Sequence, residues 1–128
     1  MPEVGQQNVP MKTTPDRQIR DQHKDALRLL GYFLLRQARH KEAIEVYRGL
    51  LSLNPSDRQA RRALIAAFLG EGRNAEALEY AEGYTVETGE PHVATIHLMR
   101  AQALWRLGRA DEARSAVDMF LKLRQVTE

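Results

Sequence analysis

Three short stretches of similar sequence decide the fold of this chain: HKEAI at residues 40–44, NAEAL at residues 74–78 and ADEAR at residues 110–114. In each stretch an alanine directly follows an acidic residue, just after a predicted turn. These alanines are Ala43, Ala77 and Ala113, which lie 34 and then 36 residues apart. A period of about 34 residues is typical of arrays in which one helix–turn–helix unit stacks on the next.

The residues between these stretches favour helix almost throughout. From residue 16 to residue 123 the sequence is rich in Ala, Leu, Arg, Glu and Gln and poor in β-branched residues. Five breaks interrupt the helical pattern: residues 37–40, Asn54-Pro55, residues 70–72, residues 89–91 and Gly108. They predict an all-α fold of six helices, each of about a dozen residues, in antiparallel pairs. After the second break, the spacing of Ser56 and Gln59 predicts Ser56 as a helix cap.

Aligned on the three alanines, the chain resembles the tetratricopeptide repeat (TPR) family, with repeats at about residues 24–57, 58–91 and 94–127. The residues that carry the resemblance are Leu30-Gly31, Tyr47 and Pro55 in the first repeat, Phe68 and Gly72 in the second, and Ala101 and Gly108 in the third. Small residues are expected where two helices approach closely, which predicts Gly31, Ala43, Ala77, Ala101 and Ala113 at helix crossings. The resemblance implies a curved solenoid of three antiparallel helix pairs.

The start of the chain differs in composition from the rest. Residues 1–15 contain one Gly, several Pro, Gln and Thr, and little to bury, which predicts a flexible, disordered N-terminal tail before a TPR domain at residues 16–128. Pro15 is expected as the first helical residue, with Thr14 as its cap, because proline lacks the N–H that would go unpaired there.

Composition excludes several classes of function. The 128 residues include no Cys, so disulfides, thiolate metal sites and a cysteine nucleophile are ruled out. The 19 Lys and Arg nearly balance the 17 Asp and Glu, which leaves a net charge of +2 and argues against a nucleic-acid partner. No apolar run is long enough to span a membrane, and the first residues do not form a secretory signal. The expectation is a cytoplasmic protein that does not insert into a membrane.

Residues suited to catalysis or metal binding are not grouped anywhere in the sequence. The histidines His23, His40, His92 and His97 do not pair at metal-ligand spacing, and we expect them on the surface. No nucleophile motif is present, and the glycines of residues 70–72 lack the lysine of a phosphate-binding loop. We therefore expect no enzyme activity, no metal and no cofactor.

The concave face of a TPR solenoid is lined by the first helix of each pair, and this position predicts a partner-binding groove. Its residues are Arg28, Tyr32, Leu35, Arg36, Arg62, Ala66, Leu69, Leu98, Gln102 and Trp105. The mixture of large apolar side chains and arginines suits an apolar or amphipathic peptide with some acidic residues. Tyr32, Leu35 and Trp105 could instead complete the core, and for a lone Trp at helical spacing the core is the favoured location.

Two further features favour a protein partner. Residues 29–35 are apolar around the whole helix, so this helix should be covered on two sides. In the last predicted helix, residues 111–124, the core stripe is expected to be Ala113, Ala116, Val117 and Phe120. Met119, Leu121 and Leu123 widen its apolar arc to about 200°. Because no residues remain for a polar capping helix, these three predict a second interface, for a partner or for self-association.

A basic cluster lies at the start of the second repeat. Arg58, Arg61 and Arg62 oppose the helix macrodipole in or near the first turn, at a cost of a few tenths of a kcal/mol each. The cluster either docks acidic groups of a partner or forms a solvated basic face that Asp57 compensates.

From about residue 29 to residue 123 the chain resembles a narrower group, the SctY/YscY type of cytosolic chaperone of bacterial type III secretion. The shared features, in order, are Leu30-Gly31-Tyr32, Leu53-Asn54-Pro55 followed by Arg61-Arg62, Arg100-Ala101-Gln102, Ala113-Arg114, and FLKL at residues 120–123. The chain departs from this group in its extra residues 1–22 and in Ala38-Arg39, where a glycine turn is expected.

This narrower resemblance implies a non-enzymatic chaperone. Such proteins bind a small exported partner of the SctX/YscX type and dock on the cytosolic domain of the export gate. Carried over by position, the partner groove includes Tyr32, Leu35, Leu69, Leu98 and Trp105.

Three alternatives stay open. They are a chaperone of translocator or needle subunits, a general TPR scaffold or adaptor, and a chaperone that grips peptide C-termini through a Lys and Asn clamp. Arg28, Tyr32 and Ala63 stand at the clamp positions, so that clamp is largely missing.

Overall fold

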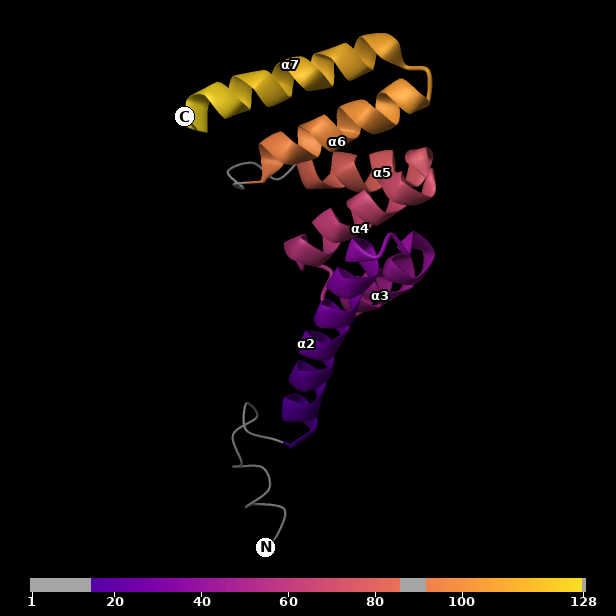
Figure 1. The fold of residues 1–128 in the computed structure, drawn as a ribbon. Coiled ribbons are helices and arrows are strands. Elements are labelled where there is room, and N and C mark those ends of the chain that lie inside the picture. The colour runs from indigo at the N-terminus through magenta and orange to yellow at the C-terminus, as the bar shows by residue number, and fades with distance from the viewer. Residues whose placement is uncertain (1–14, 86–91, 128) are drawn as a thin grey trace, which may run out of the picture.

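The computed structural model describes residues 15–85 and 92–127, which form helices and turns and contain no strand (Figure 1). The helices are α2 (Pro15–Arg36), α3 (His40–Leu53), α4 (Arg58–Glu71), α5 (Asn74–Thr85), α6 (Val93–Arg106) and α7 (Ala110–Thr127). The prediction of an all-α fold with six helices in pairs is confirmed. Helix α2 begins at Pro15, as predicted. The predicted tail, its cap Thr14 and the break at residues 89–91 lie outside the described residues.

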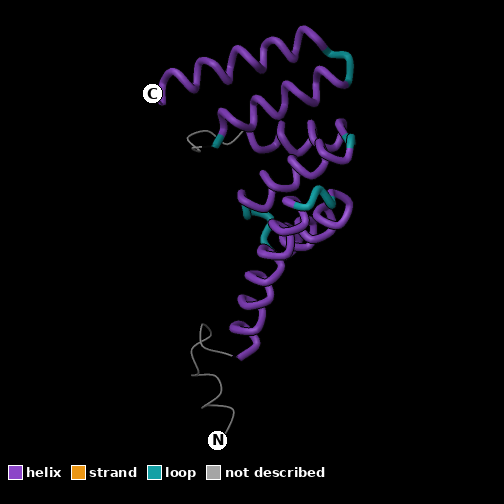
Figure 2. Tube along the Cα trace, viewed as in Figure 1, coloured by secondary structure: helices purple, strands orange, loops and turns teal. Residues whose placement is uncertain are grey.

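The helices stack in chain order into one curved row (Figures 1 and 2). Each helix packs against the next one along the chain. The backbones of the first helices of the pairs also come close to their counterparts, α2 to α4 and α4 to α6. The backbones of the described second helices, α3, α5 and α7, do not come as close, although Arg48 of α3 reaches Glu76 of α5 in an ion pair of 3.3 Å. The row is therefore closer together on the side of α2, α4 and α6, which makes that side concave.

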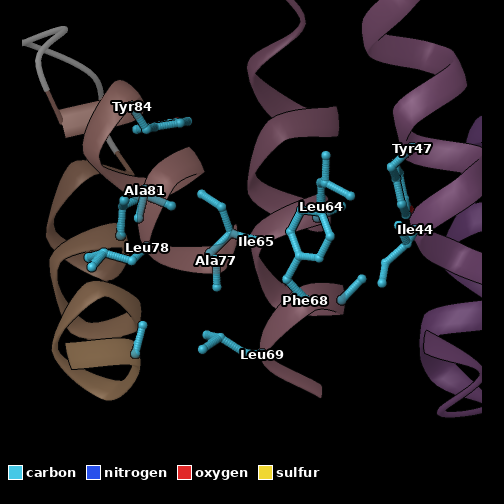
Figure 3. Close-up of a cluster of buried hydrophobic side chains, with 14 of the residues drawn as sticks. Ile44, Tyr47, Leu64, Ile65, Phe68, Leu69, Ala77, Leu78, Ala81 and Tyr84 are labelled. Atoms are coloured by element: carbon cyan, nitrogen blue, oxygen red, sulfur yellow. The ribbon is translucent and has the colours of Figure 1, made fainter. Parts of the chain in front are cut away.

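The core is centred on α4, which packs apolar side chains on two opposite faces. Figure 3 shows Leu64 and Phe68 on the side facing Ile44 and Tyr47 of α3. On the opposite side of α4, Ile65 and Leu69 face the apolar residues of α5, which are Ala77, Leu78 and Ala81. Nearly all of these side chains are fully buried, so α4 packs continuously against α3 of the first pair on one face and against its own partner α5 on the other.

The small residues predicted at helix crossings lie at close contacts. Ala43 and Ala77 are fully buried, and Ala101 and Ala113 are nearly so. Gly31 is also buried, and a Cβ atom at this position would lie 2.7 Å from Cζ of Tyr47. The predicted need for small side chains at these positions is confirmed.

The same turn follows the first helix of every pair. Ala38, Gly72 and Gly108 occupy equivalent positions and adopt left-handed φ angles of 58°, 80° and 80°. In each turn the next residue donates its N–H, at 2.9 Å, to a carbonyl of the preceding helix, the pattern of a Schellman motif. Ala38 thus holds the glycine position of the first repeat in the same conformation.

A second repeated feature was not anticipated from the sequence. Arg39, Arg73 and Arg109 precede the second helix of each pair, and each bonds the glutamate three residues later, at 2.6–2.7 Å. These glutamates, Glu42, Glu76 and Glu112, lie in the first helical turn, where a negative charge is favourable. The Arg-x-x-Glu spacing was visible in the sequence and marks the repeat as clearly as the alanines do.

The predicted cap of α4 is wrong by one residue. Asp57, not Ser56, is the N-cap, and its Oδ1 accepts a hydrogen bond from the N–H of Ala60 at 3.0 Å. The N–H of Ser56 donates instead to Oδ1 of Asn54 at 3.1 Å. A carboxylate at the N-cap also offsets the arginines that follow it.

Candidate protein-binding surface

The predicted groove residues divide into three groups by exposure. Exposed side chains belong to Tyr32, Arg36, Leu98, Gln102 and Trp105. Partly buried ones belong to Arg28, Leu35, Arg62 and Ala66, and Leu69 is buried. All of them come from α2, α4 and α6, the helices of the concave side.

The aromatic residues of this set are surface residues. Trp105 is 65% exposed and Tyr32 is 55% exposed, so the interpretation that placed Trp105 in the core is wrong. The guanidinium of Arg36 lies over the Tyr32 ring, 5.8 Å from its centroid. Large apolar side chains exposed on a concave surface are typical of protein contacts.

Leu69 departs from the groove prediction. It points from α4 toward α5 and belongs to the core cluster (Figure 3). Leu35, its counterpart in α2, is partly buried and packs against the same cluster. The third counterpart, Trp105, stays exposed because no further helix pair of the described chain covers it. The same repeat position is thus core in the middle of the row and surface at its end.

Arg28 links two repeats instead of standing free in the groove. Its Nη2 bonds Oδ2 of Asp57 at 2.9 Å, and its Nη1 bonds Oε1 of Gln59 at 2.7 Å. Burial alone would raise the pKa of Asp57, but the hydrogen bonds from Arg28 and from the Ala60 N–H outweigh it, so the pKa lies below its ordinary value. Arg28 therefore fixes α2 against the start of α4.

This geometry predicts a pH-dependent contribution from Asp57. Asp57→Ala should lower the unfolding free energy at neutral pH by about 1 kcal/mol through loss of the cap. The folded-state pKa lies below the unfolded value of about 3.9. The ionised carboxylate therefore stabilises the fold above that pH, and the contribution disappears as the pH falls through the folded-state pKa.

Urea unfolding of wild type, Asp57→Ala and Asp57→Asn at neutral and acidic pH measures the effect. The asparagine keeps the capping oxygen but not the charge, so the gap in unfolding free energy between wild type and Asp57→Asn should narrow as the pH falls below about 3.9 and through the folded-state pKa. A gap that is independent of pH would contradict the prediction.

The basic cluster is largely engaged within the fold. Arg62 donates to the hydroxyl of Tyr84 at 2.9 Å, and the guanidinium of Arg61 lies 5.5 Å from the ring centroid of Tyr80. Both contacts tie α4 to α5. Arg61 and Arg62 are thus partly buried against tyrosines that the sequence did not reveal, whereas Arg58 is exposed.

The structure brings part of the predicted groove together in a hollow between α6 and α7. The hollow has a volume of about 570 Å³ and is lined by Leu98, Ala101, Gln102, Trp105, Ala113, Arg114, Val117 and Asp118. Its surface is mostly apolar, with the charged groups of Arg114 and Asp118 among the lining residues. We call this feature the α6–α7 hollow.

Sequence reasoning missed the contribution of α7 to the hollow. Val117 was expected in the core stripe, but it is 37% exposed and lines the hollow, so this assignment is wrong. Ala113 and Ala116 are buried as predicted, whereas Phe120 is only partly buried. The signal that could have found the hollow is the repeat alignment, since five of its eight lining residues align with buried positions of the second repeat.

The proposed second interface on α7 is partly exposed. Met119 and Leu121 are 44% and 46% exposed, and Leu123 is partly buried. Within the described residues, α7 contacts α6 and no other helix.

The remaining sequence predictions concern metal binding, membrane-spanning helices and the location of the histidines. In residues 15–85 and 92–127 no group of three or more metal-binding side chains is arranged around a common point. No helix in these ranges combines the length and apolarity required to cross a bilayer. His40 and His97 are partly buried rather than on the surface, and burial lowers the pKa of His97.

Comparison with known families fits this geometry. One tetratricopeptide repeat model matches residues 24–67, and a second matches residues 63–125. The chain belongs to the tetratricopeptide repeat family. No curated protein sequence matches it. TPR units generally serve as scaffolds that bind other proteins and do not catalyse reactions themselves, so the concave side and the α6–α7 hollow are its candidate binding surfaces.

Proposed function

We propose that this TPR protein is a cytoplasmic chaperone of bacterial type III secretion, of the SctY/YscY type. It binds a small exported protein of the SctX/YscX type and helps to deliver it to the export gate. The ordered sequence features shared with that group support the proposal, from Leu30-Gly31-Tyr32 to residues 120–123. The structural observation that carries the binding role is the exposure of Trp105, which lines the α6–α7 hollow together with Leu98.

The exposed residues suit an export substrate. A protein that waits for export must stay unfolded without aggregating, and an amphipathic helix laid on an apolar surface meets both needs. Tyr32, Leu98 and Trp105 offer apolar contact, and Arg36 beside Tyr32 offers a cation for an acidic side chain. Arg28, Arg62 and Leu69 are left out of the proposed contact because their side chains are engaged within the fold.

Co-expression tests the chaperone role. The chain is produced together with a small exported protein of the SctX/YscX type, and the two should copurify as a stable complex and both be needed for secretion. Copurification with an assembly unrelated to secretion would favour a general scaffold, and binding of translocator or needle subunits would favour that chaperone class.

A substitution at the surface tests the residues. Trp105→Ala should weaken binding of the partner more than tenfold, because an exposed tryptophan at the centre of a contact is a typical hot spot. The control is Glu79→Ala, an exposed position of α5, which should bind as wild type does. Isothermal titration with each variant measures the change, and equal affinity for all three chains would overturn the proposed surface.

A further inference from the structure

The α6–α7 hollow occupies the place where each earlier helix pair receives the next helix. With the 34- and 36-residue offsets, its lining residues Ala101, Trp105, Ala113 and Val117 correspond to Ile65, Leu69, Ala77 and Ala81 of the second pair. In the second pair these positions are all buried, and α6 is the next helix packed against α4 and α5. In the first pair α4 packs in the same way against α2 and α3. The hollow therefore corresponds to the site at which the earlier pairs receive the next helix, and no helix of the described residues occupies it.

The other end of the row exposes a face of the matching kind. Ala60, Ala63, Leu64 and Ala67 of α4 are buried in the contact with the pair before it. The equivalent positions of α2 are Ala26, Leu29, Leu30 and Phe33, and all four are exposed, Leu29 by 70% and Phe33 by 53%. The two observations are complementary. Among the described residues, no preceding pair covers this face of α2, and no following helix fills the hollow.

Helix lengths agree with this match. With 22 and 18 residues, α2 and α7 are the longest helices of the described chain, whereas the others have 12 to 14. A first-of-pair helix runs antiparallel to the helix that precedes it, so its N-terminal end lies beside the C-terminal end of that helix. The N-terminal extension of α2 and the C-terminal extension of α7 would thus lie side by side across a stacked contact.

One polar contact also has an equivalent. Arg106 of α6 reaches back to the preceding pair, where its Nη1 donates to the carbonyl of Leu69 at 2.9 Å and to Oδ1 of Asn74 at 3.3 Å. Its counterpart in α2 is Arg36, and the counterpart of the Leu69 carbonyl is that of Trp105. In a stacked contact Arg36 would be placed to bond this carbonyl.

We propose that, while no exported partner is bound, the occupant of the α6–α7 hollow is helix α2 of a second copy of this chain, so that copies associate head to tail and continue the solenoid. Charged Arg114 stands where the earlier pairs have buried Ile44 and Leu78, which makes this contact weaker than the internal ones. The association is therefore reversible. Because the two contact surfaces differ, it does not close at the dimer but continues to longer oligomers as the concentration rises.

Sedimentation velocity on the full chain, with two complementary variants, tests the proposal. Phe33→Glu places a charge on the exposed face of α2, and Val117→Glu places one in the hollow. The wild-type average mass should rise beyond that of a dimer with concentration, and each variant alone should stay monomeric. An equimolar mixture of the two variants should form a dimer with one copy of each and no larger species, because only one intact face and one intact hollow remain to pair.

The control is Ser115→Glu, an exposed site in the same helix as Val117, at the position where α3 and α5 carry Glu45 and Glu79. It should associate as wild type does, and circular dichroism should show the same helical content for all chains. A wild-type chain that is monomeric at every concentration would overturn the proposal and leave the hollow to a different protein. A dimer that is broken only by Val117→Glu would also overturn it, since that result indicates a symmetric contact between two hollows.

Discussion

Phe68→Ala should lower the unfolding free energy by about 4 kcal/mol, since truncation of a fully buried phenylalanine costs about 3–5 kcal/mol. Phe68 is completely buried in α4, at the centre of the row. Its ring lies 5.4 Å from that of Tyr80 in α5, and the guanidiniums of Arg48 and Arg73 lie 5.5 Å and 5.0 Å from its centroid. The substitution therefore removes contacts to α3, α5 and the turn between α4 and α5 at once.

The effect on the whole chain should exceed that on one pair. In a stacked array each pair is stabilised by its neighbours, so weakening the middle pair uncouples the two ends. A domain of this size has a total unfolding free energy of about 5–15 kcal/mol, so the variant should lose a large part of its stability. Urea unfolding followed by circular dichroism measures the change.

Phe33→Ala is the matched control. It removes the same atoms from a phenylalanine that is 53% exposed, and at low protein concentration it should cost about 0.5 kcal/mol or less. Similar losses for Phe33→Ala and Phe68→Ala would contradict the burial pattern on which the fold description depends.

The contrast between these two phenylalanines shows what the sequence could and could not predict. Helix number, repeat period and the small residues at crossings followed from local patterns, because turn residues and close contacts recur at fixed spacing. The burial of individual side chains could not be predicted from these patterns, because the same apolar repeat position is buried or exposed according to whether another helix pair stacks on it. Leu69 and Trp105 are equivalent by repeat, yet one is core and the other is surface.

Polar contacts between repeats were harder still to predict. Arg62 meets Tyr84 and Arg28 meets Asp57, over separations of 22 and 29 residues. Nothing in the local sequence indicates such partners, and the arginines therefore suggested a ligand surface. When these contacts between repeats are taken into account, the residues available to a partner are the exposed aromatic and apolar residues and those at the two ends of the row.

The second large effect concerns two glycines within helices. Alanine in place of an unconstrained helical glycine stabilises a helix by about 1 kcal/mol. At Gly49 of α3 a Cβ atom would meet no other atom within 4 Å, so Gly49→Ala should stabilise the chain by about this amount. Gly31 of α2 faces the buried ring of Tyr47, and a Cβ atom there would lie 2.7 Å from Cζ and 2.8 Å from Cε2 of that ring.

Gly31→Ala should therefore have the opposite sign. The Tyr47 ring is completely buried, so it cannot move aside without disturbing the contact between α2 and α3. Overpacking costs up to about 3 kcal/mol, which outweighs the gain in helix propensity and leaves a net loss of about 2 kcal/mol. Urea unfolding of both variants measures the pair of effects.

A double-mutant cycle assigns the loss at Gly31 to its contact. In a Tyr47→Leu background the ring is gone, and although that change is itself destabilising, Gly31→Ala should then cost much less than in the wild-type chain. The coupling between the two positions is the decisive quantity, because a general loss of helix packing would leave the cost unchanged. Stabilisation by both glycine substitutions, or an absence of coupling to Tyr47, would show that α2 and α3 do not cross at Gly31.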